Sequence, residues 1–153
     1  MSQEMSVRAR EIARRVARAH AIAEKSDSYV SRSKTQAETL VRIRSLDKTQ
    51  IRGLETVAHT TDKVSDVTNW LKLRVGRDEK RNKWAREGIG RELLTVLEGL
   101  RDDARDIAAQ IKQEYPLPDE DADLERQVHL RLIREYLKHL VAHFEYRKGE
   151  ESG

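Results

Sequence analysis

Basic side chains in the middle of this 153-residue chain are the residues best suited to chemistry, and that chemistry is the binding of phosphate groups. Between residues 72 and 91 the chain carries eight Lys or Arg and three acidic residues, a local excess of five positive charges. The basic residues are Lys72, Arg74, Arg77, Lys80, Arg81, Lys83, Arg86 and Arg91. Because a forked guanidinium matches phosphate oxygens with two parallel hydrogen bonds, the segment predicts a surface that faces a polyanion. The alternative is that these charges only solvate helix faces.

A second pattern that could do chemistry is the spacing of Glu135, His139 and His143. Steps of four residues bring these side chains to one face of a helix, where two imidazoles and a carboxylate could bind a metal ion. A zinc protease needs Glu directly after the first His, and Leu140 stands there instead. We therefore favour a half-buried polar stripe on a helix and predict no metal site.

Other kinds of active site are disfavoured. The segment Gly88-Ile89-Gly90-Arg91 could present backbone N–H groups to a phosphate, but it lacks the third glycine and the Lys-Ser/Thr ending of nucleotide-binding loops. A turn between two helices is the better interpretation. The chain contains no cysteine, which excludes a thiol nucleophile. We expect no catalytic residue and no cofactor, although a triad assembled from distant segments stays open.

The charge along the chain is uneven. Residues 1–60 carry a net charge of +5, residues 61–118 of +1 and residues 119–153 of −3. One end therefore favours anions and the other repels them. Five Arg residues between positions 8 and 18, and the lack of any run of about eighteen apolar residues, argue against a signal peptide or a membrane span. Together with the lack of cysteine, this predicts a cytoplasmic protein without a membrane partner.

Apolar residues at helical spacing predict the elements that must position the basic side chains. The first is a helix over residues 6–24, whose small apolar face should let another helix approach closely and whose basic face should stay in solvent. The apolar face consists of Ile12, Val16, Ala19 and Ala23, and the basic face of Arg10, Arg14 and Arg18. The Ser-rich segment 26–33 should form a loop or a weakly ordered helix turn, and a short helix is expected around 35–45.

Four further helices are predicted downstream. Asp47 should open the first of them, because Gln50 three positions later completes a capping box. The other three are expected over residues 62–80, 89–115 and 122–148. The helix over 89–115 carries an apolar seam at alternating steps of three and four residues. The seam consists of Leu93, Leu97, Leu100, Ala104, Ile107 and Ile111.

These elements define one domain, residues 1–153, with an all-α fold: a compact bundle of about five or six helices. No alternation typical of strands appears in the sequence. Residues 1–5 and 149–153 are expected to be disordered tails. Residues 116–123 are expected to be a proline-containing, acidic linker between the last two helices, because proline cannot continue a helix.

Three short motifs make the chain similar to a known family. Thr49-Gln50-Ile51-Arg52 opens a helix, Leu71-Lys72 is followed by Gly76-Arg77, and the segment 136–146 lies in the closing helix. With these motifs, residues 46–148 resemble the small subunit of type III-A CRISPR effector complexes, the Csm family. The chain departs from the family at Val75, where an aromatic residue is usual, at His143-Phe144 in place of Tyr-His, and in its long Arg-rich first helix. The small subunit of the type III-B (Cmr) complexes is therefore the next closest.

The resemblance implies a non-catalytic, RNA-binding subunit that stacks along crRNA and target RNA within a CRISPR effector filament. It implies as partners those RNAs, other CRISPR effector subunits and copies of the chain itself. RNA-binding or filament-facing roles are implied for Gln50, Arg52, Lys72 and Arg77, and electrostatics adds Arg74 and Arg81. The alternative is a helical scaffold or adaptor that homo-oligomerises and does not bind nucleic acid.

Overall fold

The computed structural model describes residues 5–152, and most of these residues are helical. This range contains seven α-helices, one 3-10 turn and no strand. The elements are α1 (Val7–Ser28), α2 (Val30–Val41), α3 (Lys48–Thr60), α4 (Val64–Gly76), the 3-10 turn η1 (Arg86–Gly88), α5 (Ile89–Glu114), α6 (Pro118–Asp121) and α7 (Leu124–Ser152). Six helices span 12 to 29 residues and α6 is a single turn. The predicted all-α bundle is therefore confirmed.

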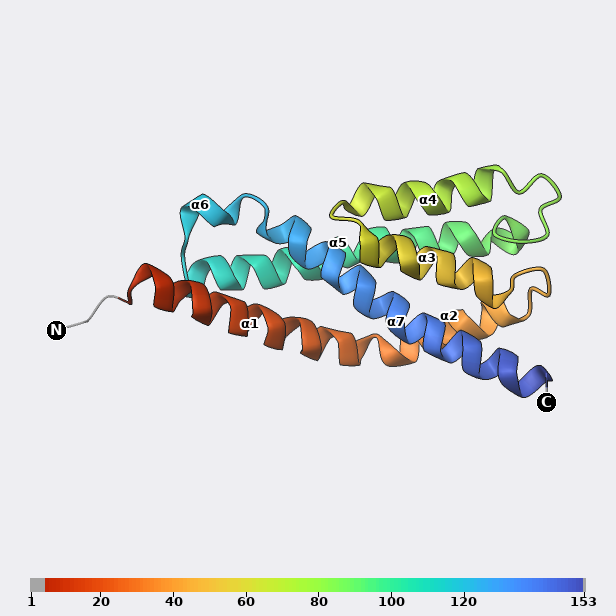
Figure 1. The fold of residues 1–153 in the computed structure, drawn as a ribbon, viewed down its shortest axis with the longest axis horizontal. Coiled ribbons are helices and arrows are strands. Elements are labelled where there is room, and N and C mark those ends of the chain that lie inside the picture. Colours follow the sequence, from red (N-terminus) through yellow and green to blue (C-terminus); the bar gives the residue numbers. More distant parts are fainter. Residues whose placement is uncertain (1–4, 153) are drawn as a thin grey trace.

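The helix α7 is the centre of the bundle. It crosses the molecule diagonally in Figure 1 and packs against α1, α2, α3 and α5. Because other helices cover it on several sides, its apolar residues do not form one stripe, and Leu130 and Leu132 are buried as well as Ile133 and Leu137. The helix α4 packs mainly against α3 and α5 and lies at the upper edge of Figure 1.

The predicted seam of α5 supplies the other half of the core. All of its six residues are buried: Leu93, Leu97, Leu100, Ala104, Ile107 and Ile111. The helix packs mainly against α7, and also against α4 and α1. The spacing that predicted the helix therefore also identified its buried face.

Asp47 begins α3 through the predicted capping box. The backbone N–H of Gln50 donates to Asp47 Oδ1 over 3.0 Å, and the backbone N–H of Asp47 donates to Gln50 Oε1 over 3.1 Å. Two backbone donors are satisfied in this way. The same bonds fix the position of the Gln50 side chain at the first turn of α3.

The Ser-rich segment 26–33 is helical except at Tyr29, which excludes the loop, one of the two predicted alternatives. The helix α1 runs to Ser28 and α2 begins at Val30, so that only Tyr29 separates them. Tyr29 is buried, and its hydroxyl donates to Asp103 Oδ2 of α5 over 2.8 Å. Its ring also meets Tyr136 of α7 edge to face. Packing against α5 and α7 therefore overrides the modest helix propensity of serine.

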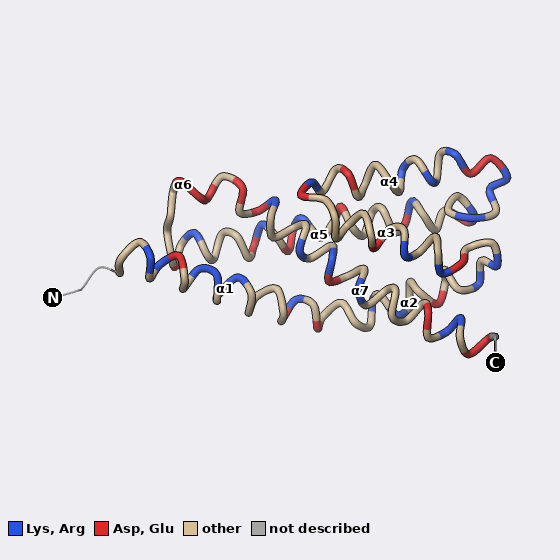
Figure 2. Tube along the Cα trace, in the orientation of Figure 1, with Lys and Arg blue, Asp and Glu red and all other residues tan. Residues whose placement is uncertain are grey.

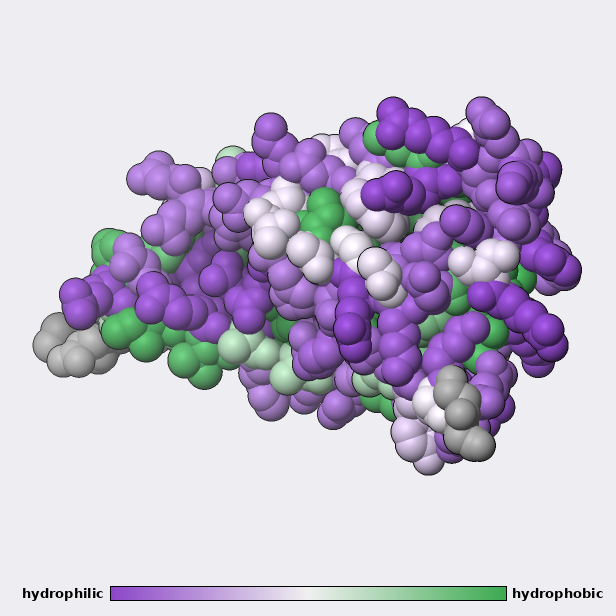
Figure 3. Space-filling model, turned by 45° about the vertical axis from the view of Figure 1, so that its right-hand side comes forward, coloured by the Kyte–Doolittle hydropathy of each residue, from purple (hydrophilic) through white to green (hydrophobic). Residues whose placement is uncertain are grey.

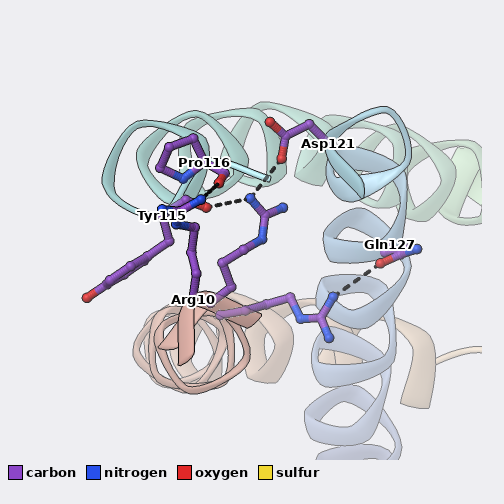
Figure 4. Close-up of polar contacts among 7 residues, drawn as sticks. Arg10, Tyr115, Pro116, Asp121 and Gln127 are labelled. Carbon is purple, nitrogen blue, oxygen red and sulfur yellow. Dashed lines mark hydrogen bonds and ion pairs between the residues drawn. The ribbon is translucent and has the colours of Figure 1, made fainter. Parts of the chain in front are cut away.

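The basic face of α1 points into the bundle, although it was predicted to stay in solvent. Arg14 is only 6% exposed. Its Nη1 donates to the carbonyl of Tyr115 over 2.8 Å and lies 2.8 Å from Asp121 Oδ1. Arg10 donates to the carbonyl of Pro116 over 3.2 Å (Figure 4). These two carbonyls directly follow the end of α5 at Glu114, where no helical N–H is available to them, and they accept guanidinium donors instead.

The apolar face of α1 consequently points outward. Ile12 is 50% exposed and Val16 is 65% exposed. On the inner side, Arg18 Nη1 donates to Gln127 Oε1 of α7 over 3.1 Å (Figure 4). Burial lowers the pKa of Arg18, and the positive charge of Arg131 adds to this effect.

Two predicted boundaries differ in the structure. The helix expected over 62–80 ends at Gly76, and an irregular loop follows it up to η1. The linker expected over 116–123 contains the one-turn helix α6, with Pro118 at its first position. Proline is well suited to that position because its missing N–H has no partner there in any case.

The C-terminal end of the described chain also differs from the prediction. Residues 149–152 continue α7 and are helical, whereas a disordered tail was predicted. Residues 1–4 and 153, which were also predicted to be tails, lie outside the described residues. Within the described range, no helix is both long enough and apolar enough to cross a membrane.

Candidate nucleic-acid interface

A groove of about 800 Å³ lies where the first turns of α3, the second half of α4 and the loop before η1 meet. Its cationic residues are Arg74, Arg77, Lys80 and Lys83, and its aromatic residues are Trp70 and Trp84. From α3 come Thr49, Gln50 and Gly53, and from the loop Asp78, Glu79 and Asn82. We call this site the basic groove. Figure 2 shows Lys and Arg gathered at the end of α4 and in the loop that follows it.

The two tryptophans form the apolar part of the basic groove. Trp84 is only 2% exposed, and Trp70 is half-buried. Their rings meet edge to face, with centroids 5.9 Å apart and planes at 84°. The guanidinium carbon of Arg74 lies 4.7 Å from the centroid of the Trp70 ring, a cation–π contact. The Nε1 atom of Trp84 is buried and has no hydrogen-bond partner among the described residues.

Glycine 53 allows Trp70 to lie directly against α3. A Cβ atom at Gly53 would stand 3.0 Å from Cζ2 of the Trp70 ring, closer than ordinary packing permits. The ring therefore occupies the space that a side chain on α3 would fill. This contact joins α4 to α3 at the basic groove.

Asp78 organises the loop that carries the cations. Its Oδ2 accepts hydrogen bonds from the backbone N–H groups of Lys83 and Ala85, each over 2.9 Å. Partial burial alone would raise the pKa of the Asp78 carboxyl, but these backbone N–H groups outweigh that effect and hold the pKa below its usual range. Arg81 sits within this loop with a left-handed φ of 51°, a conformation that a non-glycine residue adopts only at some cost.

Gly90 fixes the other side of the same loop. Its backbone N–H donates to the carbonyl of Trp84 over 2.9 Å, so this donor is already used within the chain. A Cβ atom at Gly90 would stand 2.4 Å from that carbonyl oxygen and 2.5 Å from Cγ2 of Val75. Gly88 supplies the left-handed turn before α5, with a φ of 73°. The change of direction is therefore made at Gly88, the last residue of η1, and α5 begins directly after it at Ile89.

The six residues predicted to face RNA or the filament divide into two groups. Gln50, Arg74 and Arg77 line the basic groove. The others, Arg52, Lys72 and Arg81, do not line it, although all three are exposed. Arg52 instead forms an ion pair with Glu145 of α7. The Gln50 side-chain oxygen is engaged in the capping box, so its amide N–H₂ group is the part that can serve a ligand.

Sequence reasoning missed the two tryptophans as members of this site. Neither Trp70 nor Trp84 was among the residues predicted to form a site. One signal was present: both tryptophans of the chain lie within or beside its most basic segment. Aromatic residues interleaved with cations are typical of surfaces that bind single-stranded nucleic acid.

The residues Glu135, His139 and His143 do not come together as a metal site. No group of three or more His, Asp or Glu in the described range is placed to hold a metal ion. His139 Nε2 lies 2.9 Å from Ser26 Oγ of α1, and Glu135 binds Lys138 over 3.0 Å. Burial lowers the pKa of His139.

The contact between Ser26 and His139 is the one Ser–His pair that hydrogen-bonds in the described range. Ser26 is only 5% exposed and lies inside the last turns of α1. A substrate cannot reach its hydroxyl in this arrangement. The pair therefore joins α1 to α7 rather than forming an open nucleophilic site.

Comparisons with known proteins identify no relative of this chain. No protein-family model, no curated protein and no solved structure matches it.

Proposed function

We propose that the basic groove binds single-stranded RNA, and that the chain is a non-catalytic small subunit of a type III CRISPR ribonucleoprotein that stacks along crRNA and target RNA. One observation carries the RNA-binding part: the half-buried ring of Trp70 and four cations line the same groove. Single-stranded nucleic acids bind where cations contact the phosphates and aromatic rings stack on the bases.

The geometry of Trp70 and Arg74 supports this proposal. Trp70 is only half-buried, so part of its ring can meet a base. The Arg74 guanidinium already lies over the ring, and a guanidinium plane can itself stack on a base. Arg77, Lys80 and Lys83 are exposed next to this stack and can contact the flanking phosphates.

The local charge also supports an anionic ligand. Four cations and two acids line the basic groove, and one of the acids, Asp78, is engaged with backbone N–H groups. The assignment to a CRISPR complex rests on the three sequence motifs, two of which, Thr49-Gln50-Ile51-Arg52 and Gly76-Arg77, contribute residues to the basic groove.

The test is a fluorescence titration with single-stranded RNA. Because both tryptophans of the chain line the basic groove, their emission reports binding there without a label. An RNA of about 16 nucleotides covers the site sizes typical of single-strand binding folds. We expect saturable quenching, and an affinity whose log-log dependence on salt has a slope of about −0.7 for each phosphate contact.

Two matched triple variants locate the contact. The groove variant is Arg74→Gln, Arg77→Gln and Lys83→Gln, and its salt slope should flatten by about 2. The control is Lys34→Gln, Arg126→Gln and Arg147→Gln, which removes the same charge from exposed positions on α2 and α7. Equal loss of RNA affinity in both variants, or no saturable binding by the wild type, would refute the proposal that RNA binds at the basic groove. Retention of the other effector subunits in a pull-down tests the CRISPR assignment separately.

A helical scaffold that homo-oligomerises without nucleic acid is the second candidate. The outward apolar face of α1 favours it, since such a face is typical of protein contacts. Self-association that depends on protein concentration, in the absence of salt-dependent RNA binding, would place this candidate first.

A further inference from the structure

The exposed face of α1 carries a regular apolar seam that no other helix of the described chain covers. Its members are Ala9, Ile12, Val16, Ala19 and Ala23, all exposed, with Met5 preceding them. From Met5 onward they follow steps of four, three, four, three and four residues, the repeat of a coiled-coil interface. Figure 3 shows an apolar strip along the lower left edge of the molecule, over α1. We call these five residues the α1 seam.

The α1 seam cannot turn inward. The opposite side of the helix holds Arg14, which is bound to the Tyr115 carbonyl and to Asp121. Rotation of α1 about its axis would leave the buried guanidinium without these partners, a strongly unfavourable change. The outward direction of the seam is therefore fixed by the arginines on the inner face.

The size of the side chains suits a second helix. Three of the five seam residues are alanine, so a partner backbone can approach to the short end of the usual 8–10 Å between helix axes. Ile12 and Val16 provide the larger apolar contacts at the centre. The seam runs for about 21 Å from Ala9 to Ala23, or about four turns, which is enough for a helix pair. It lacks the Trp, Phe and Leu with which helices insert into membrane surfaces.

The charges beside the seam determine what kind of helix fits. Arg8 and Arg15, one heptad apart, border one side of it; both are exposed, and neither forms an ion pair among the described residues. If two copies of α1 paired in antiparallel orientation, the Arg8 and Arg15 border of one copy would lie against the same border of the other. Arginine would then lie opposite arginine. In a parallel pair this border would meet the border that carries Ala13 and His20. Neither arrangement gives the arginines an acidic partner.

We propose that the α1 seam docks an amphipathic helix of a different protein, one whose apolar stripe is bordered by Asp or Glu. The acidic border would pair with Arg8 and Arg15, and the apolar stripe would cover Ile12 and Val16. This inference does not depend on the proposed RNA binding, since the basic groove lies on α3, α4 and the loop before η1.

The experiment uses the full chain and two labelled helical peptides of about 20 residues, a length that supports a helix on binding. Both peptides carry Leu and Ala in a seam of alternating three- and four-residue steps, and they differ only in having Glu or Lys at the bordering positions. Fluorescence anisotropy should show that the Glu peptide binds about tenfold more tightly than the Lys peptide. The double variant Arg8→Glu, Arg15→Glu should reverse this preference.

Two further variants keep the test falsifiable. Val16→Glu should abolish binding of both peptides, whereas Val30→Glu, at an exposed apolar residue of α2, should not. Unfolding midpoints should stay equal to wild type, because all of these residues are exposed. The proposal is overturned by equal binding of the two peptides, by no binding, by self-association that Val16→Glu removes, or by seam-dependent binding to vesicles that contain phosphatidylserine.

Discussion

Arg14 on α1 and Arg77 at the end of α4 have the same side chain but opposite surroundings. Arg14 is buried and held by a backbone carbonyl and a carboxylate, whereas Arg77 is exposed and forms no ion pair among the described residues. The first guanidinium contributes to folding, because its Nη1 is engaged with two partners inside the chain. The second guanidinium contributes little to the stability of the fold, and it is available to a phosphate. The comparison teaches that the partners of an arginine, rather than its position in a basic segment, decide its role.

The largest expected effect on stability is that of replacing Arg14. Arg14→Ala should lower the free energy of unfolding by about 3 kcal/mol, because it leaves Asp121 and the end of α5 without their buried partner. Arg77→Ala should change it by no more than about 0.5 kcal/mol, as for an ordinary surface residue. Urea unfolding measures both. Similar values for the two variants would show that Arg14 is not anchored as described.

The next largest effect is expected at Gly90, which supports the basic groove from behind. Gly90→Ala should destabilise the protein by about 2 kcal/mol, because the new methyl group would overlap the Trp84 carbonyl and Val75. It should also shift the tryptophan emission. Gly99→Ala on the same helix is the control, since nothing lies within 4 Å of its added Cβ, and it should stabilise by about 0.5–1 kcal/mol. Equal destabilisation by both would contradict the close contact.

Arg77→Lys sharpens the comparison at the level of a single contact. We expect RNA affinity to fall by about 1 kcal/mol, or roughly fivefold, because an ammonium cannot reproduce a two-pronged contact to phosphate. The free energy of unfolding should not change. Lys72→Gln, outside the basic groove, should leave affinity unchanged. The measurement is the fluorescence titration described above, and a loss at Lys72 that matches the loss at Arg77 would move the interface along α4.

The smallest expected effect is the change in stability at low pH, which should differ between the core around His129 and the loop around Asp78. Burial lowers the pKa of His129, whose Nε2 lies 2.9 Å from the Leu97 carbonyl in the core between α5 and α7. Below the ordinary pKa of about 6.5 the unfolded chain takes up a proton that the folded chain does not, so stability should fall as the pH drops below this value. The Asp78 loop should hold until lower pH, since its carboxyl loses its stabilising charge only as the pH falls through its lowered pKa.

Unfolding free energies between pH 7 and pH 5 measure the His129 contribution. His129→Gln keeps a donor near the Leu97 carbonyl but does not titrate, so its curve should be flatter than that of the wild type. An identical slope in the variant would assign the acid sensitivity to another group, with His139 the next residue to test.

Several features were determined by the sequence alone because they depend on neighbours a few residues apart. The seam of α5 follows from steps of three and four residues, and the start of α3 follows from Asp47 and Gln50. The turn predicted at Gly88-Ile89-Gly90-Arg91 is present at Gly88, whereas the other three residues already belong to α5. Three of the six residues predicted to face RNA or the filament, Gln50, Arg74 and Arg77, line the basic groove, and the role of all six stays a prediction.

Only the tertiary structure decided which face of α1 is buried. Local spacing places Ile12 and Val16 on one side of α1 and Arg10, Arg14 and Arg18 on the other, but it does not reveal what lies opposite. The free carbonyls after α5 and the carboxylate of α6 are about one hundred residues away in the chain, and they attract the arginines. The meeting of Trp70 with Trp84 likewise depends on the Asp78 loop, whose path no periodic pattern specifies. Contacts between distant segments leave no pattern in the local sequence. Only the tertiary structure therefore distinguishes Arg14, which is held inside the fold, from Arg77, which is exposed.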